Sequence, residues 1–177
     1  MRILFVFPNI DSPGYKLVGV STLSALTKAA GHKTALYDTS FIETSDICMN
    51  KDWATNISIG EDILNFKPID QTGVHLKKKV DLKEDFLKKL RGFNPEMVAI
   101  SCLSTEWFIT QLILQYTKEY DPSIYTIVGG RHCIADPEGS IECPDVDAIC
   151  VGEGERAFLK LMEVLEQGSM QYSIPGL

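Results

Sequence analysis

The chain has 177 residues, 45% hydrophobic and 23% charged, which is ordinary for one soluble globular domain with a core of its own. Its formal net charge of −7 argues against a nucleic-acid-binding surface, which would need a basic stripe. The apolar runs are far shorter than the roughly 20 residues of a membrane span, and the short apolar start is typical of a strand and not of a signal peptide.

Five short apolar runs alternate with helical patterns along the chain. The expected strands span residues 3–7, 34–37, 97–102, 124–128 and 148–151. Helices are expected at 18–30, 82–90, 106–120 and 157–165, where apolar side chains recur every three or four residues. Strands that are apolar on both faces, with helices between them, predict a parallel sheet covered on both sides. The expected fold is a doubly wound α/β domain, flavodoxin-like or Rossmann-like, with five parallel strands in the order 2-1-3-4-5.

Two segments fall outside this alternation. Residues 40–80 show no clear period, and we interpret them as an irregular insertion whose lysines at 77–79 form a solvated face. The final residues, 173–177, resemble a linker. We therefore expect one domain, residues 1–172, cut from a longer polypeptide.

Small and polar residues gather where four of the five strands end. Because the carboxyl ends of parallel strands meet at one edge of a sheet, these loops predict a single binding site. Glycines there expose backbone N–H groups, and serine hydroxyls bind amides or phosphates without adding charge. The candidate residues are Pro8, Asn9, Asp11 and Gly14 after the first strand, Ser101, Leu103 and Ser104 after the third, Gly129, Gly130 and His132 after the fourth, and Gly152, Glu153 and Gly154 after the fifth.

Each of these loops also has a purely structural interpretation. A glycine pair after a strand makes a tight turn, and the GEGE sequence lacks the spacing of a dinucleotide-binding GxGxxG motif. Ser104 or Thr105 can cap the helix that begins near Glu106. A structural explanation would have to hold four times at the same edge, which favours a binding site. No nucleophile–base pair is visible at this edge, so no catalytic residue is assigned.

The five cysteines indicate a redox environment and exclude two kinds of metal site. Their number is odd and no signal peptide precedes them, which favours a reducing cytoplasm. No pair has CxxC spacing and no three form CxxxCxxC, so the sequence predicts neither a zinc nor an iron–sulfur site within this chain.

The loops after the third and fourth strands resemble those of cobalamin-binding domains, which carry SxL and GG at these places. Ser101-Cys102-Leu103 and Gly129-Gly130 match both motifs. The resemblance implies that the dimethylbenzimidazole tail of cobalamin passes between these loops, where small residues leave room for it. The family's DxHxxG histidine, which binds cobalt, has no counterpart in residues 9–14. The resemblance therefore implies base-off cobalamin without a histidine ligand.

The remaining motifs resemble a narrower group, the N-terminal domains of cobalamin-dependent radical S-adenosylmethionine enzymes. His132, Asp136-Pro137-Glu138, Asp147 and the GEGE loop match that group in order, as does the IPGL end. The resemblance implies a module of a methyltransferase or related catalyst. S-adenosylmethionine and a 4Fe-4S cluster would then bind a C-terminal radical domain of the same polypeptide, and the chain alone would be inactive. The alternatives are a flavodoxin-like nucleotide-binding protein and a stand-alone cobalamin sensor.

Overall fold

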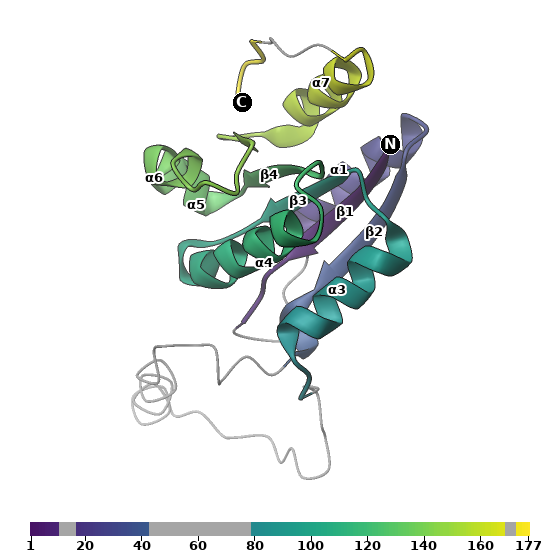
Figure 1. The fold of residues 1–177 in the computed structure, drawn as a ribbon. Coiled ribbons are helices and arrows are strands. Elements are labelled where there is room, and N and C mark those ends of the chain that lie inside the picture. Colours follow the sequence, from purple (N-terminus) through teal and green to yellow (C-terminus); the bar gives the residue numbers. More distant parts are fainter. Residues whose placement is uncertain (11–16, 43–78, 169–172) are drawn as a thin grey trace, which may run out of the picture.

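A five-stranded parallel sheet in the order β2-β1-β3-β4-β5 forms the middle layer of the protein (Figure 1). The computed structural model describes residues 1–10, 17–42, 79–168 and 173–177. The predicted fold class and strand order are confirmed. The strands are β1 (Arg2–Phe7), β2 (Lys33–Asp38), β3 (Met97–Ser101), β4 (Tyr125–Gly129) and β5 (Ala148–Ile149).

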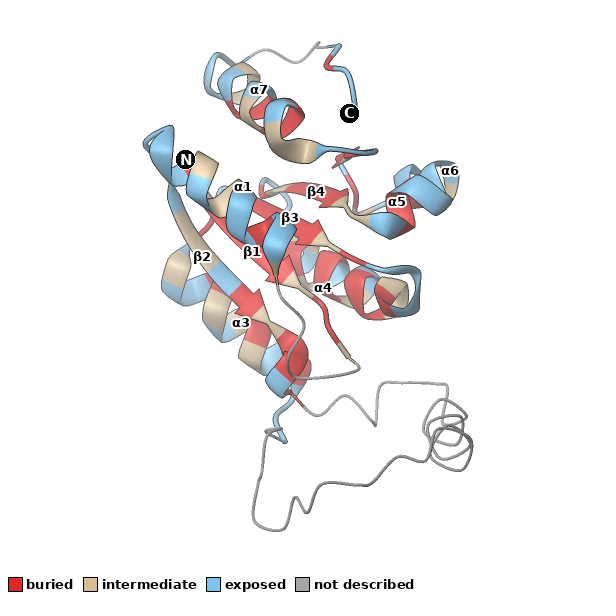
Figure 2. Ribbon diagram, turned by 180° about the vertical axis from the view of Figure 1, so that it is seen from behind, coloured by how far each residue is buried: buried red, intermediate tan, exposed pale blue. Residues whose placement is uncertain are grey.

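Helices cover both faces of this sheet. The helices α1 (Val18–Ala29) and α7 (Gly154–Glu166) pack on one face, where Val20 and Phe158 join the core formed with β1. The helices α3 (Leu82–Phe93) and α4 (Trp107–Tyr120) pack on the other. Figure 2 shows the buried residues concentrated in the strands and in the helix faces that meet them. Burial on both faces explains the apolar runs in β1, β3 and β4, whereas the edge strand β2 is mostly half-buried or exposed and carries Lys33 and Asp38.

The strands alternate strictly between these two cores. In β3, Met97 and Ala99 belong to the core under α1 and α7, whereas Val98 and Ile100 belong to the core under α3 and α4. Successive side chains of a strand point to opposite faces, so the next residue, Ser101, lies on the α1–α7 side. This alternation decides which loop residues can share a pocket.

Several elements differ from the expected bounds. The helix expected at 106–120 begins as a 3-10 turn, η2 (Ser104–Glu106), and α7 begins at Gly154 instead of 157. Another 3-10 turn, η1 (Thr39–Phe41), follows β2, and two short helices, α5 (Arg131–Ala135) and α6 (Pro137–Ile141), lie between β4 and β5. Five-residue helices are too short to show an apolar period, which is why the sequence pattern missed them.

The DPE motif has a structural role at the start of α6. The Asp136 side chain accepts a hydrogen bond from the Gly139 N–H at 3.0 Å, and Pro137 occupies the first turn. Aspartate before a helix and proline in its first turn both favour helix initiation. The motif is therefore explained by local folding alone.

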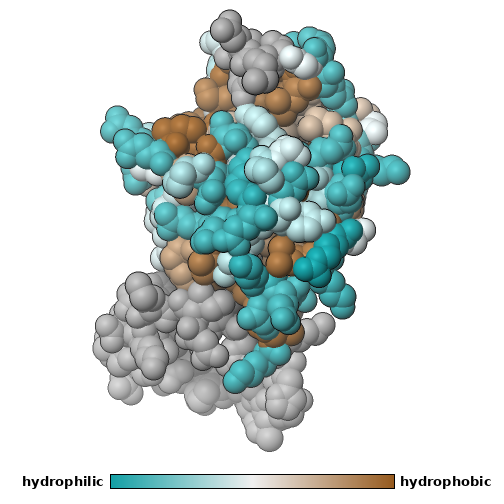
Figure 3. Space-filling model, viewed as in Figure 1, coloured by the Kyte–Doolittle hydropathy of each residue, from teal (hydrophilic) through white to brown (hydrophobic). Residues whose placement is uncertain are grey.

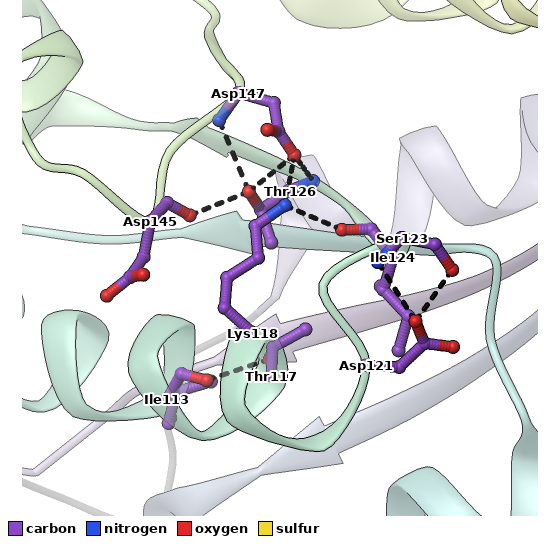
Figure 4. A network of polar contacts seen from close by, with 9 residues as sticks. All are labelled: Ile113, Thr117, Lys118, Asp121, Ser123, Ile124, Thr126, Asp145 and Asp147. Atoms are coloured by element: carbon purple, nitrogen blue, oxygen red, sulfur yellow. Dashed lines mark hydrogen bonds and ion pairs between the residues drawn. The ribbon is translucent and has the colours of Figure 1, made fainter.

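Asp147 also has a structural role, at the edge of the sheet opposite the candidate loops (Figure 4). Its carboxylate accepts hydrogen bonds from the Lys118 ammonium at 2.6 Å and from the Thr126 N–H at 2.7 Å. Lys118 also donates to the Ile124 carbonyl at 2.9 Å. This network ties the end of α4 to the starting ends of β4 and β5.

Hydrophilic side chains predominate on the face that α3 and α4 cover, and its apolar side chains form small, separate patches (Figure 3). Over the described residues, no helix combines the length and apolar character that a membrane crossing requires.

Candidate functional site

A pocket of about 170 Å³ lies at the carboxyl ends of β3, β4 and β5, on the face covered by α1 and α7. The three loops that follow these strands all contribute to it, as the parallel sheet predicts. Six of the predicted residues line it: Ser101, Gly129, Gly130, Gly152, Glu153 and Gly154.

The deep part of the pocket is apolar and was not predicted from the sequence. Phe5, Ile127 and Phe158 line it with exposed fractions of 2–3%, and Val20 with 6%. The rings of Phe5 and Phe158 lie 5.6 Å apart, centroid to centroid. In the sequence these side chains are indistinguishable from other core residues. Only the packing of α1 and α7 beside the strand ends turns this part of the core into a pocket wall.

Ser101 and Gly129 lie side by side at the carboxyl ends of β3 and β4 and line the pocket. They are register partners in neighbouring strands, and Ile127, two residues before Gly129, faces the same side. A Cβ atom placed on Gly129 would lie 3.5 Å from the Cβ of Cys150, an ordinary van der Waals distance. The backbone would therefore accept a side chain here, and the glycine preserves open space.

Gly130 is a glycine for a different reason. Its φ is +99°, and a Cβ atom would lie 2.5 Å from the carbonyl oxygen of Cys102. The two loops cross here in direct backbone contact, because the Cys102 N–H donates to the Gly129 carbonyl at 3.0 Å. Only glycine tolerates both this φ and this approach. The GG motif thus combines one residue that keeps space with one that allows the loops to cross.

The rim of the pocket is acidic. Gly152 and Glu153 are exposed, Glu155 is partly buried, and all three line the opening beside α7. A carboxylate accepts hydrogen bonds but cannot donate them when ionised, so this rim suits a ligand that presents hydroxyl or amide N–H groups.

Ser104 and His132 lie outside the pocket lining, next to α4. His132 is 7% exposed, its Nδ1 lies 3.2 Å from the Ser104 hydroxyl, and its ring is stacked on Trp107 with centroids 4.3 Å apart. Its buried Nε2 has no hydrogen-bond partner within the described residues. The sequence placed all the loops in one site. The structure brings six candidates into the pocket and holds these two apart from it.

The alternative in which Ser104 caps the following helix is wrong. The N-cap of α4 is Glu106, which makes no side-chain cap bond, whereas Ser104 is paired with His132. Glu106 itself is 2% exposed, and its Oε2 accepts a hydrogen bond from the Leu103 N–H at 2.9 Å. An acidic residue three positions after Leu103 has the spacing of a helix-start carboxylate, which could have indicated this role.

Within the described residues, the loop after β1 is hydrogen-bonded to the turn after β2. Asn9 is fully buried, its side-chain amide donates to the Ser40 hydroxyl at 2.8 Å, and its carbonyl accepts from the Thr39 hydroxyl at 2.9 Å. Pro8 is buried beside it. These contacts hold the end of β1 to the turn after β2, outside the pocket lining. Asp11 and Gly14 lie outside the described residues, as do residues 43–78, which make up most of the predicted insertion at 40–80.

The thiols beside the pocket are held in the neutral form. Burial raises the pKa of Cys102 to about 12 and also raises the pKa values of Cys133 and Cys150. A thiol acts as a nucleophile or metal ligand only when it is deprotonated. The described ranges contain no group of three or more potential metal-ligating side chains. These cysteines therefore act as small apolar side chains.

The last residues pack against the fifth loop. The Val151 N–H donates to the Gly176 carbonyl at 2.8 Å, and Ile174 is 7% exposed in the core under α1 and α7. The segment expected to be a linker is thus docked beside the rim of the pocket.

The B12 binding domain family model matches residues 69–162, which include the third and fourth loops. Anaerobic magnesium-protoporphyrin IX monomethyl ester cyclase from Rubrivivax gelatinosus is 28% identical over 95% of the chain and 25% of its own length. Cytidylyl-2-hydroxyethylphosphonate methyltransferase from Streptomyces wedmorensis is 28% identical over 66% of the chain and 22% of its length.

The fold is similar to a solved structure from Kitasatospora setae, the radical S-adenosylmethionine methyltransferase TsrM with cobalamin and a [4Fe-4S] cluster bound. The TM-score is 0.66 at 15% identity, over 99% of the chain and 28% of TsrM. The tryptophan-bound form gives 0.67 at 16% identity. The chain thus spans about a quarter of the length of these proteins.

Proposed function

The chain belongs to the B12 binding domain family, and from this premise we propose that it is a cobalamin-binding module that takes the nucleotide tail of the cofactor into the pocket behind Ser101 and Gly129. The observation that carries the proposal is this register pair, which lines an apolar pocket at the carboxyl ends of two neighbouring strands. A core of ordinary density has no such space at the middle of a sheet edge.

The pocket fits a flat aromatic base. An apolar protein cavity of about 150 Å³ holds benzene, and this pocket measures about 170 Å³ and opens at its rim. Ser101 offers a hydroxyl in the lining of the pocket, and Glu153 offers an acceptor for the hydroxyls of a ribose. When bound, cobalamin supplies a cobalt centre that can carry a methyl group.

For the whole protein we propose a cobalamin-dependent radical S-adenosylmethionine enzyme of the methyltransferase type. Support comes from the solved structure of TsrM, a radical S-adenosylmethionine methyltransferase with cobalamin bound, and from a relative that is named as a methyltransferase. This chain covers about a quarter of the length of each. The S-adenosylmethionine site and the 4Fe-4S cluster would lie in a C-terminal radical domain. Residues 1–172, together with the end at 173–177 that packs on them, would form the cobalamin domain. The sequence of this chain contains no CxxxCxxC motif for such a cluster.

The proposal predicts that the 177-residue chain binds cobalamin and does not cleave S-adenosylmethionine. After incubation with hydroxocobalamin, gel filtration should recover protein with the absorbance of the corrin, and the same experiment with flavin mononucleotide should recover colourless protein. Cobalamin should dissociate faster than from the full-length protein, because one face of the cofactor stays open to water in the domain alone.

The matched control is the full-length protein, assayed in parallel for cleavage of S-adenosylmethionine. Retention of flavin in place of cobalamin would contradict the proposed cofactor. Cleavage of S-adenosylmethionine by the 177-residue chain would contradict the proposal that the S-adenosylmethionine site lies in a separate radical domain.

A second prediction concerns the lower face of cobalt, which we expect to lack a histidine ligand. Residues 8–14 contain no histidine. His132 is buried against Ser104 and Trp107 outside the pocket lining, and His32 lies 3.1 Å from the N-terminal amine at the opposite edge. With the tail base in the pocket, neither of the two histidines that the structure describes would be placed to bind cobalt.

Electron paramagnetic resonance of the Co(II) form checks this expectation. The spectrum should show no nitrogen superhyperfine splitting, and His132→Gln should leave it unchanged. A nitrogen splitting that disappears in His132→Gln would assign a histidine ligand and contradict the proposal. A splitting that survives would assign the nitrogen to the tail base or to another histidine, and it would contradict the proposal as well.

A further inference from the structure

We infer that the pocket selects the base of the cofactor's nucleotide tail, favouring an apolar benzimidazole over a purine such as adenine. The inference rests on the proposed function, because it concerns the group that the pocket would hold. It goes further in naming the chemistry that the pocket accepts and the side chains that impose this preference.

The preference comes from the division of the pocket into an apolar depth and a polar rim. Phe5, Val20, Ile127 and Phe158, which line its depth, are at most 6% exposed, and none carries a hydrogen-bonding side chain. Leu23 of α1 adds a further apolar wall. A base that enters past Ser101 therefore meets aliphatic and aromatic carbon.

Free backbone N–H groups occur at the rim of the pocket, because α7 begins there at Gly154 without a side-chain cap. The two N–H groups that directly follow β3 and β5 are paired. The Cys150 N–H donates to the Val128 carbonyl at 2.7 Å, and the Cys102 N–H donates to the Gly129 carbonyl at 3.0 Å. These groups are committed to the sheet and to the loop crossing. The polar side chains of the lining are Ser101, Glu153 and Glu155, at the strand end and the rim, together with the Cys150 thiol, a weak hydrogen-bonding group.

A purine presents polar groups that a dimethylbenzimidazole replaces with carbon. Adenine carries an amino group and two more ring nitrogens than benzimidazole. In the apolar depth these groups would lose their hydrogen bonds to water without gaining protein partners. Leaving polar groups unpaired on burial should weaken binding about tenfold or more, whereas the methyl groups of dimethylbenzimidazole gain from the same burial.

The test is a titration of the chain with three corrinoids, followed by absorbance: cobalamin, the cobamide with adenine as its lower base, and cobinamide, which has no nucleotide tail. We expect cobalamin to bind about tenfold or more tightly than the adenine cobamide. Equal affinities for these two, with cobinamide weaker than both, would overturn the base selection and leave the tail pocket intact. Equal affinities for all three would overturn the tail pocket as well.

Exchanging one wall residue tests which side chains impose the preference. Leu23→Gln places an amide in the half-buried wall of α1 and should narrow the ratio between cobalamin and the adenine cobamide. Leu159→Gln is the matched control, because Leu159 is also half-buried but lies on α7 outside the pocket lining. In this variant the ratio between the affinities for cobalamin and the adenine cobamide should stay unchanged. An unchanged ratio in folded Leu23→Gln, or equal narrowing in both variants, would overturn the assignment. If Leu23→Gln does not fold, the three-corrinoid titration of the unaltered chain still decides the inference.

Discussion

Replacing Ser101 with leucine is expected to weaken cobalamin binding by about 10- to 100-fold, because overpacking a tight site costs about 1–3 kcal/mol. Ser101 lies opposite Gly129 at the ends of β3 and β4, on the face that opens into the pocket. A leucine side chain would extend into the space that the tail base needs. The side chain would lie at the end of a strand, so the sheet itself should form as before.

The measurement is the dissociation constant for cobalamin, with thermal unfolding of the cofactor-free chain to verify the fold. Ser101→Ala is the matched control, because it removes the hydroxyl and keeps the space, and it should bind more tightly than the leucine variant. Comparable affinity in Ser101→Leu and the unaltered chain would rule out the tail pocket. Comparable losses in both variants would show that the hydroxyl matters and the space does not.

The second prediction separates the two glycines of the GG motif by their effect on stability. Gly130→Ala is expected to lower the free energy of unfolding by about 2–4 kcal/mol, since strain at positive φ and overpacking each cost about 1–3 kcal/mol. The new Cβ would lie 2.5 Å from the Cys102 carbonyl oxygen, where the two loops cross. Gly129→Ala meets its nearest neighbour at 3.5 Å and should change stability by less than about 1 kcal/mol.

Urea denaturation of the cofactor-free chain measures both variants under the same conditions. The two changes are chemically identical and adjacent in sequence, so each is the control for the other. Equal stability of the two variants would contradict the loop crossing at Gly130. A larger loss in Gly129→Ala would contradict the interpretation that this glycine preserves open space.

The fold was predictable because its information is local and periodic. Runs such as residues 3–7 and 97–100 are apolar at every position, which occurs where a strand is buried on both faces. The helix pattern that follows each strand then leaves few topologies with short, right-handed connections. What the pattern missed were the turns without a period, namely η2, α5 and α6, which depend on single side chains such as Asp136.

The candidate site was predictable only in part. The strand ends identified Ser101, Gly129 and Glu153, because parallel strands bring their carboxyl ends to one edge in any arrangement of this class. The same reasoning could not reveal that Phe5 and Phe158 line the pocket, since a buried phenylalanine has the same pattern in a core and in a pocket wall. It also placed Ser104 and His132 with the others, although they pack beside α4.

The sequence by itself determined the sheet, its strand order and the edge at which small and polar residues gather, because strand periodicity and chain connectivity constrain all three. Only the tertiary structure decided which of these residues share a pocket. A side chain's face depends on the register of its strand, and the space in front of it depends on the helix packed there. Gly129 and Gly130 differ by nothing in the sequence, yet one keeps a cavity open and the other lets two backbones touch, because the Cys150 side chain faces the first and the Cys102 carbonyl faces the second.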